Sequence, residues 1–169
     1  VRLNVTDSDG SWSLTNTTIT ITDVGPVASF KAVPPTVPEG VELELNASAS
    51  YEPGMDIVSY EWDLDNDGAF DDGTGAVIRH IWYKPGTYPV KLRVTDTSSN
   101  TSSVASSVVI TDVIPVAEFT DNTPKDEGDP VELNATASFE PGNDIISYEW
   151  DIDNDGNFDD KTGQIINYT

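Results

Sequence analysis

The sequence lacks cysteine, so it has no disulfide framework, no thiolate metal site and no cysteine nucleophile. Because His80 is the only histidine, a metal centre built from several histidines of one chain is excluded. A Ser-His-Asp triad could use only this histidine. Basic residues are also scarce, with 8 Lys and Arg against 30 Asp and Glu and a net charge of −22. This charge repels nucleic acid and anionic membranes and favours cations as partners. Because no apolar run approaches the roughly 18 residues of a membrane span, we expect no direct membrane insertion by this segment.

The chain repeats itself with a period near 89 residues. The ten residues Ser59–Gly68 return 88 positions later as Ser147–Gly156 with one Leu-to-Ile change, and residues 1–7 resemble residues 90–96. We therefore divide the chain into the last two strands of a preceding repeat (1–22), one complete repeat (23–111) and a repeat lacking its last strands (112–169). A period of this length is too long for a solenoid unit and suits a string of autonomous domains.

Within a repeat, the pattern is typical of β-structure throughout. Residues 41–45, 57–62, 88–94 and 104–110 alternate or are rich in β-branched and aromatic side chains, and turn-forming Pro, Gly and Asn separate them. About seven short strands in such a length predict an all-β fold of tandem immunoglobulin-like β-sandwiches. Trp62 and Trp150 are then expected between the two sheets rather than on a ligand-binding surface.

The complete repeat resembles the PKD domain (polycystic kidney disease repeat), an immunoglobulin-like module of extracellular proteins. The family's Tyr-x-Trp-Asp, His-x-Tyr and Gly-x-Tyr-x-Val-x-Leu-x-Val-x-Asp stretches are matched by Tyr60, Trp62, Asp63, Asp67, Gly68, His80, Trp82, Gly86, Tyr88, Val90, Leu92, Val94 and Asp96. Asp65-Asn66 replaces the family's usual glycine, Trp82 replaces tyrosine, and Tyr168 takes the histidine position in the last repeat. The resemblance implies a structural role for His80 beside a turn.

Alternate carboxylates follow each repeated tryptophan. Residues 63–72 read Asp-x-Asp-x-Asp-Gly-x-x-Asp-Asp, like the start of an EF-hand calcium loop. Ca²⁺ takes about six to eight oxygen ligands, and the glycine permits the sharp turn. We therefore predict Ca²⁺ as the cofactor. The expected ligands, including two backbone carbonyls and two completing aspartates, are Asp63, Asp65, Asp67, Ala69, Asp71, Asp72, Asp151, Asp153, Asp155, Asn157, Asp159 and Asp160.

Other interpretations of these loops stay open. Position 12 holds Thr74 or Thr162 instead of the bidentate glutamate, so helical EF-hand geometry is not implied. Asn-Asp-Gly is also common in solvated acidic turns, which is how we interpret the shorter Asp7–Gly10. A salty habitat is a second explanation for the net charge. If calcium binds, we expect it to stiffen the junction near Asp112, with help from Glu140 or Asp144.

Asn-x-Ser/Thr sequons are more frequent than the composition predicts and indicate an exported, glycosylated surface. They occur at Asn4, Asn16, Asn46, Asn100, Asn134 and Asn167. We therefore expect an extracellular, cell-surface location, where calcium is abundant; a leader or anchor would lie in parts of a longer protein. Simple richness in Asn, Ser and Thr is the alternative.

The ends of the chain allow two assemblies. Residues 1–22 resemble residues 90–111, and the last repeat lacks the counterpart of about residues 81–111. The segment is either an excerpt of a longer tandem array or a subunit whose first strands complete the next subunit by donor-strand exchange. In both assemblies the partners are neighbouring repeats or like subunits. The proline-containing linkers favour a stiff rod.

The carboxylates cluster in short turns without cleft-forming insertions, so we expect no enzyme activity. The prediction is a non-catalytic structural or adhesive module, a calcium-stiffened rod or spacer of an S-layer-like, adhesin or filament protein of an archaeal or bacterial envelope. The alternative is an accessory module of a secreted hydrolase that binds substrate or surface glycans through exposed aromatics. Trp12, Trp82 and Tyr83 are its candidate residues.

Overall fold

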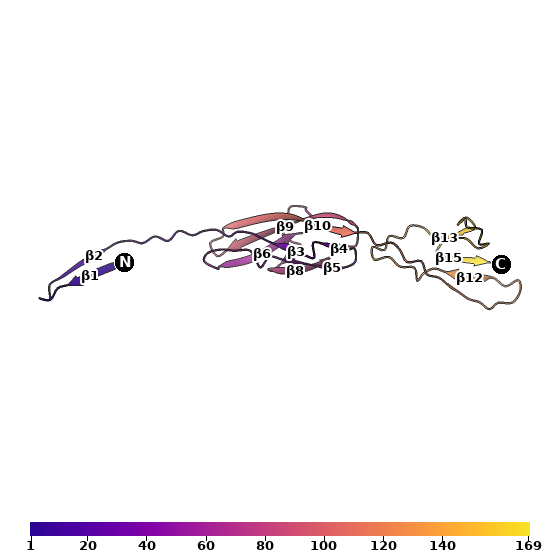
Figure 1. Ribbon diagram of the computed structural model, residues 1–169, viewed down its shortest axis with the longest axis horizontal. Helices are drawn as coiled ribbons and strands as arrows, with labels where there is room; N and C mark the ends of the chain where they lie inside the picture. Colours follow the sequence, from indigo (N-terminus) through magenta and orange to yellow (C-terminus); the bar gives the residue numbers. More distant parts are fainter.

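The computed structural model describes residues 1–169 as strands and loops arranged in an elongated molecule (Figure 1). A hairpin lies at one end, a sandwich in the middle and a smaller β-segment at the other end. No helix that could span a membrane is present. The expected all-β, immunoglobulin-like fold is confirmed.

Residues 23–111 form two sheets that pack face to face. Their strands are β3 (Lys31–Val33), β4 (Thr36–Pro38), β5 (Glu42–Asn46), β6 (Ile57–Asp63), β7 (Gly73–Thr74), β8 (Val77–Ile81), β9 (Gly86–Asp96) and β10 (Thr101–Thr111). One sheet has the order β4-β10-β9-β6-β7 and the other β3-β5-β8. All pairs are antiparallel except β4 with β10. This order makes an immunoglobulin-like sandwich.

The core of this sandwich follows from the alternation along β9. Val90, Leu92 and Val94 are fully buried between the sheets, so the intervening Lys91 and Arg93 point to the opposite face. Trp62 is also fully buried, and its indole N–H donates to the Gly75 carbonyl at 2.9 Å. Twelve buried side chains form this core. The prediction that Trp62 lies between the sheets is confirmed.

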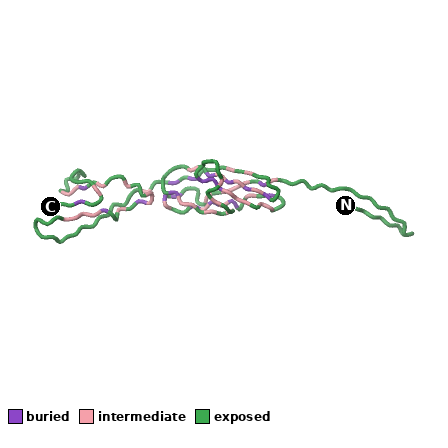
Figure 2. The backbone as a smooth tube through the Cα atoms, turned by 180° about the vertical axis from the view of Figure 1, so that it is seen from behind, coloured by how far each residue is buried: buried purple, intermediate pink, exposed green.

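Residues 112–169 reproduce the first part of that pattern with far less burial. The strands are β11 (Thr120–Asp121), β12 (Val131–Asn134), β13 (Glu149–Trp150), β14 (Lys161–Thr162) and β15 (Ile165–Tyr168). The core comprises Ala135, Trp150 and Ile166. Figure 2 shows fewer buried stretches in this segment than in the sandwich. Trp150 keeps the indole hydrogen bond, here to Gly163 at 2.8 Å, but it borders a cavity of about 530 Å³. Counterparts of β9 and β10 would cover this side of the sheet.

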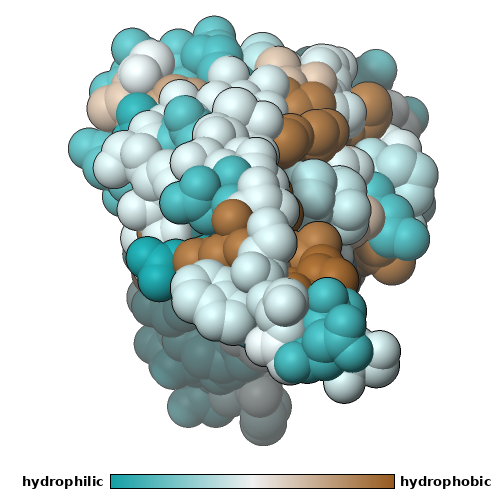
Figure 3. Space-filling model, turned by 90° about the vertical axis from the view of Figure 1, so that its left-hand side faces the viewer, coloured by the Kyte–Doolittle hydropathy of each residue, from teal (hydrophilic) through white to brown (hydrophobic).

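The N-terminal hairpin pairs β1 (Arg2–Thr6) with β2 (Trp12–Asn16), and every residue of both strands is exposed. Leu3 and Val5, which align with the fully buried Leu92 and Val94, are 58% and 59% exposed. Viewed from the hairpin end, hydrophobic residues lie in scattered patches among hydrophilic ones (Figure 3). The hairpin has strand structure but no core of its own.

Candidate metal centres

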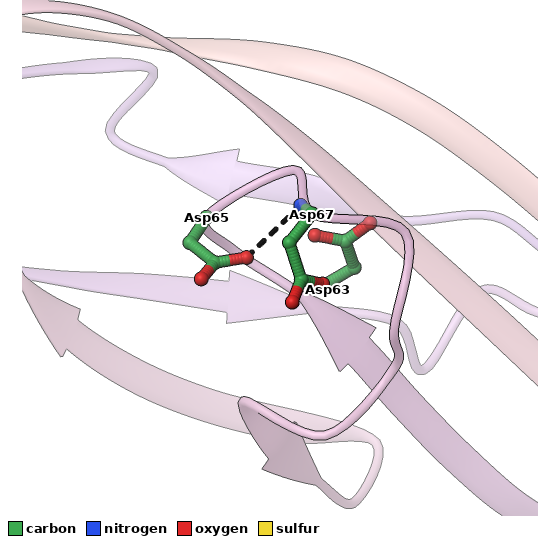
Figure 4. A group of neighbouring side chains, drawn as sticks. All are labelled: Asp63, Asp65 and Asp67. Carbon is green, nitrogen blue, oxygen red and sulfur yellow. Dashed lines mark hydrogen bonds between the residues drawn. The ribbon is translucent and has the colours of Figure 1, made fainter.

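Three carboxylates converge where the chain leaves β6 (Figure 4). One oxygen from each of Asp63, Asp65 and Asp67 lies within 4.8 Å of the other two. Asn66 and Gly68 make the turn with positive φ angles of 62° and 95°. Ligands at about 2.3 to 2.6 Å from one Ca²⁺ are separated by no more than about 5 Å, so the three oxygens fit a single ion.

Asp63 is the buried member of the group. Its side chain is fully buried, and its Oδ2 accepts hydrogen bonds from Lys91 Nζ at 2.9 Å and from the Gly68 N–H at 3.2 Å. Although burial raises the pKa of Asp63, the Lys91 ammonium and the backbone N–H groups of Asn66 and Gly68 lower it below its usual value. Its Oδ1 is buried without a partner. The carboxylate is therefore ionised with one oxygen available for a ligand.

Asp65 and Asp67 are exposed and shape the turn themselves. Asp65 Oδ1 accepts from the Asp67 N–H at 3.0 Å, and Asp67 Oδ1 accepts from the Ala69 N–H at 2.7 Å. Such local bonds also form in metal-free acidic turns, so they explain the loop's shape without an ion. Each carboxylate retains its second oxygen.

The remaining predicted ligands lie outside the three-carboxylate group. Asp72 Oδ2 accepts from the backbone N–H groups of Leu64 at 2.6 Å and Asp65 at 3.1 Å, which closes the base of the loop. Asp71 and Ala69 are exposed residues. Calcium binding, and ligation by these three residues, stay predictions.

The second loop has the same turn. Oxygens of Asp151, Asp153 and Asp155 also lie within 4.8 Å of one another. Asn154 and Gly156 repeat the positive φ angles, at 59° and 92°. Asp160 Oδ2 accepts from the Ile152 and Asp153 N–H groups, as Asp72 does in the first loop. Asn157 and Asp159, the other predicted ligands, are exposed.

The cations beside the first loop were not identified from the sequence. Lys91 pairs with Asp63, Arg93 pairs with Glu61 at 3.0 Å, and the Arg93 guanidinium lies 4.6 Å from the centroid of the Phe70 ring. All three contacts depend on the register of β9 against β6, which places Lys91 opposite Asp63. The alternation of apolar and basic residues along β9 could have indicated these cations, because it puts Lys91 and Arg93 on the outer face of the sheet.

His80 and the candidate glycan-binding aromatics are scattered. The His80 ring packs on Trp82 with 4.3 Å between centroids, and burial lowers the pKa of His80 although Asp72 opposes this effect. Trp82 is only 6% exposed and belongs to the core. Trp12 and Tyr83 are exposed, but one lies on the hairpin and the other after β8. The three aromatics therefore form no contiguous strip.

The predicted glycosylation sites differ in access. Four of the asparagines are exposed, whereas Asn46 and Asn134 are half-buried at the ends of β5 and β12. Asn100 Nδ2 donates to Asp96 Oδ2 at 3.0 Å and to Asp23. A glycan at Asn100 would occupy the nitrogen that holds the linker residue Asp23 against the sandwich. The exposed sites, where the amide is not used in this way, are Asn4, Asn16 and Asn167.

Contacts with the segment that follows Thr111 are made by other residues. Glu39 Oε1 accepts from the Val113 N–H at 2.8 Å, and Gly40 and Tyr83 approach Pro141 and Gly142. Asp63 lies opposite Lys91 in β9, five residues from Gly86, which pairs with Ile110 near the end of β10. The aspartate loop is therefore on the flank of the sandwich, and Asp112, Glu140 and Asp144 lie in a separate cluster.

Known structures with related architecture were found at low similarity. A chain described as a carbohydrate-binding module of the β-sandwich superfamily is 22% identical over 68% of this chain, with a TM-score of 0.48, and this chain spans 56% of its length. The PKD1 domain of Vibrio anguillarum Epp is 22% identical, with a TM-score of 0.44 and coverage of 53% of this chain and 96% of that domain. The PKD1 domain of the Vibrio cholerae metalloprotease PrtV is 28% identical, with a TM-score of 0.42 and coverage of 52% and 98%.

The sequence of the sandwich itself gives the assignment. A family model described as "PKD domain" matches residues 23–111, which is more than half of the chain. These residues include both sheets, the buried Trp62 and the first aspartate loop. The chain therefore belongs to the PKD-domain family.

Proposed function

We propose that this chain is a calcium-stiffened spacer of an extracellular surface protein. PKD domains occur in extracellular or secreted proteins and are generally non-catalytic modules. The elongated, end-to-end arrangement of the sandwich and the following segment suits a spacer (Figure 1). The exposed sequons suit a glycosylated surface. Other repeats or like subunits would be its neighbours in a rod.

The observation that carries the proposal is the repetition of the three-carboxylate group. The same ten residues place three oxygens within 4.8 Å of one another at Asp63–Asp67 and again at Asp151–Asp155. Repulsion among these carboxylates costs free energy unless a cation offsets it. In the first loop, Asp63 also has a buried Oδ1 without a partner. A bound Ca²⁺ would satisfy both features and fix the loop to the end of β6.

Binding of polymeric substrate is less well supported. Because Trp82 is buried and Trp12 and Tyr83 lie on different parts of the molecule, these three aromatics provide no platform for a sugar chain. We therefore favour the structural function.

Thermal unfolding with millimolar Ca²⁺ or with chelator tests the proposal. A ligand that binds only the folded state increases the free energy of unfolding, by about 2.7 kcal/mol when its concentration is a hundred times its Kd. The unfolding midpoint rises accordingly. We expect a rise of several degrees for the wild type and a clearly smaller rise for Asp65→Ala combined with Asp153→Ala. The matched control, Asp9→Ala with Asp129→Ala, removes the same charge from two exposed turns and is expected to respond like the wild type. A calcium response that is as large in the loop variant as in the wild type, or is absent from all proteins, contradicts the proposal.

A further inference from the structure

The sandwich and the following segment meet at a closely packed junction. Gly40 has a φ of +73°, and a Cβ there would lie 2.6 Å from Cβ of Pro141, so the two segments touch where only glycine fits. Next to it, Glu39 accepts the Val113 N–H at 2.8 Å. The turn at Glu140–Asp144 of one segment therefore rests on the Glu39–Gly40 turn of the other.

Glu39 is buried in this junction with half of its carboxylate unpaired. The residue is 1% exposed, and its Oε2 has no hydrogen-bond partner. A buried carboxylate oxygen that lacks a donor or a cation is energetically costly. This oxygen is directed at the neighbouring segment, because it lies 2.8 Å from the position that a Cβ of Gly142 would take.

Two further oxygens surround the same position. The carbonyl oxygen of Tyr83 lies 2.6 Å from it, and Glu140 Oε2 lies 3.0 Å from it. Glu140 is 4% exposed, and its Oε1 accepts from the Gly142 N–H at 2.6 Å. Oxygens from three separate stretches of the chain thus converge beside a residue that has no side chain.

The charges around this point are unbalanced. The hydrogen bond from the Val113 N–H lowers the pKa of Glu39. Burial and the neighbouring Glu140 and Asp112 raise it, and the net result is a raised pKa. The Gly142 N–H lowers the pKa of Glu140, whereas Glu140 raises the pKa of Asp144. Lys84 is near enough to lower the pKa of Asp144 but forms no ion pair within 4 Å. The carboxylates of Glu39, Asp112, Glu140 and Asp144 therefore have only the distant Lys84 ammonium group nearby. Their negative charge can be offset by a bound cation or by a proton shared between two of them.

We propose that a divalent cation of the calcium type binds at this junction, between Glu39 of the sandwich and Glu140 and Asp144 of the following segment. The Tyr83 carbonyl provides a further oxygen, and Asp112 adds charge. The donors are all oxygen, which is the ligand set of Ca²⁺. This site is distinct from the aspartate loops and joins two parts of the chain, so the ion would act on their relative orientation.

A related turn within the same chain serves as a control. Glu52, Gly54 and Asp56 occupy the positions of Glu140, Gly142 and Asp144. A Cβ on Gly54 would lie 2.9 Å from Glu52 Oε2, and its three nearest atoms all belong to Glu52. At this turn the nearest atoms therefore come from one residue, whereas at Gly142 they come from three stretches of the chain.

Calcium titration by calorimetry tests the proposal on the full chain carrying Asp65→Ala and Asp153→Ala, which disables the loops. We expect one remaining Ca²⁺ per chain, and at least a tenfold loss of its affinity with Glu39→Gln or Gly142→Ala. Glu52→Gln and Gly54→Ala are the matched controls and are expected to leave the affinity unchanged. Because a methyl group at Gly142 also strains the contact with Tyr83, Glu39→Gln is the decisive variant.

The outcomes separate this site from the loops and from a shared proton. If the loop variant binds no calcium, or Glu39→Gln leaves its affinity unchanged, the junction site is wrong. If Glu39→Gln raises the unfolding midpoint in chelator while calcium has no effect, a shared proton takes the place of the metal and the proposal is again wrong. If the loop substitutions do not change the stoichiometry of the wild type but Glu39→Gln removes one ion, the junction site stands and the loop sites fail.

Discussion

The two aspartate loops have almost the same sequence in different surroundings. Asp63 is fully buried and paired with Lys91, whereas Asp151 is partly exposed and its Oδ2 accepts only the Gly156 N–H, at 3.0 Å. Lys91 belongs to β9, and residues 112–169 contain no counterpart of that strand. The turn is therefore determined locally, while its charge balance depends on a strand that arrives about 30 residues later in the chain.

The cores show the same contrast. Trp62 is fully buried and contacts Phe30 edge-to-face with 5.1 Å between ring centroids. Trp150 contacts Phe119 in the same way at 5.3 Å, but it also borders the cavity of about 530 Å³. The contact between each tryptophan and its phenylalanine thus forms without the last strands of the sandwich. Full burial of the tryptophan requires those strands.

Truncation of the two tryptophans should give the largest difference. Trp62→Ala is expected to destabilise the sandwich by about 3 to 5 kcal/mol, because it removes a large side chain from a closed core. Trp150→Ala should cost residues 112–169 much less, since part of its surface already faces a cavity. Urea unfolding, followed by far-ultraviolet circular dichroism, measures both losses without relying on the tryptophans that are removed. Equal losses would show that the cavity beside Trp150 is closed in solution.

Removal of Lys91 tests the charge balance of the first loop. Without calcium, Lys91→Met leaves Asp63 buried without its partner and should cost about 1 to 3 kcal/mol. Calcium is expected to restore most of this stability, because the ion replaces the ammonium group. Lys31→Met, at an exposed lysine of β3 without an ion pair, is the control. A loss that is the same with and without calcium argues that Asp63 does not face an ion.

The fold could be predicted from the sequence because its signals are local. The period of two in β9 and the turn residues between strands identify four of the eight strands of the sandwich. The other four, β3, β4, β7 and β8, were missed because they are short or partly polar. The convergence of Asp63, Asp65 and Asp67 follows from their spacing. The Lys91 contact and the Glu39–Glu140 approach could not be predicted, because they depend on strand register and on how two segments pack.

The two loops should differ in calcium affinity. Lys91 competes with an ion at Asp63, whereas Asp151 has no ammonium partner, so we expect the second loop to bind about tenfold more tightly, or 1.4 kcal/mol. Titration of Asp65→Ala and Asp153→Ala as single variants, each with Glu39→Gln, separates the two constants. Tighter binding by the first loop would show that burial of Asp63 outweighs the charge of Lys91.

The smallest effect is expected at Asn100. Its amide holds Asp23 and Asp96, so Asn100→Ala should lower the stability of the sandwich by about 1 kcal/mol. Asn16→Ala, at an exposed sequon of the hairpin, should change nothing measurable. If the two variants unfold at the same temperature, the linker contact of Asn100 contributes nothing to stability.

Stiffening by calcium is tested most directly by a distance distribution across the junction. Because the chain has no cysteine, spin labels can be placed at Ser106→Cys on β10 and Thr162→Cys on β14, both exposed. Pulsed electron resonance should give a broad distribution in chelator and a narrow one in millimolar Ca²⁺. Distributions of equal width in the two conditions would contradict the account, because the rod would then be no stiffer with the ion than without it.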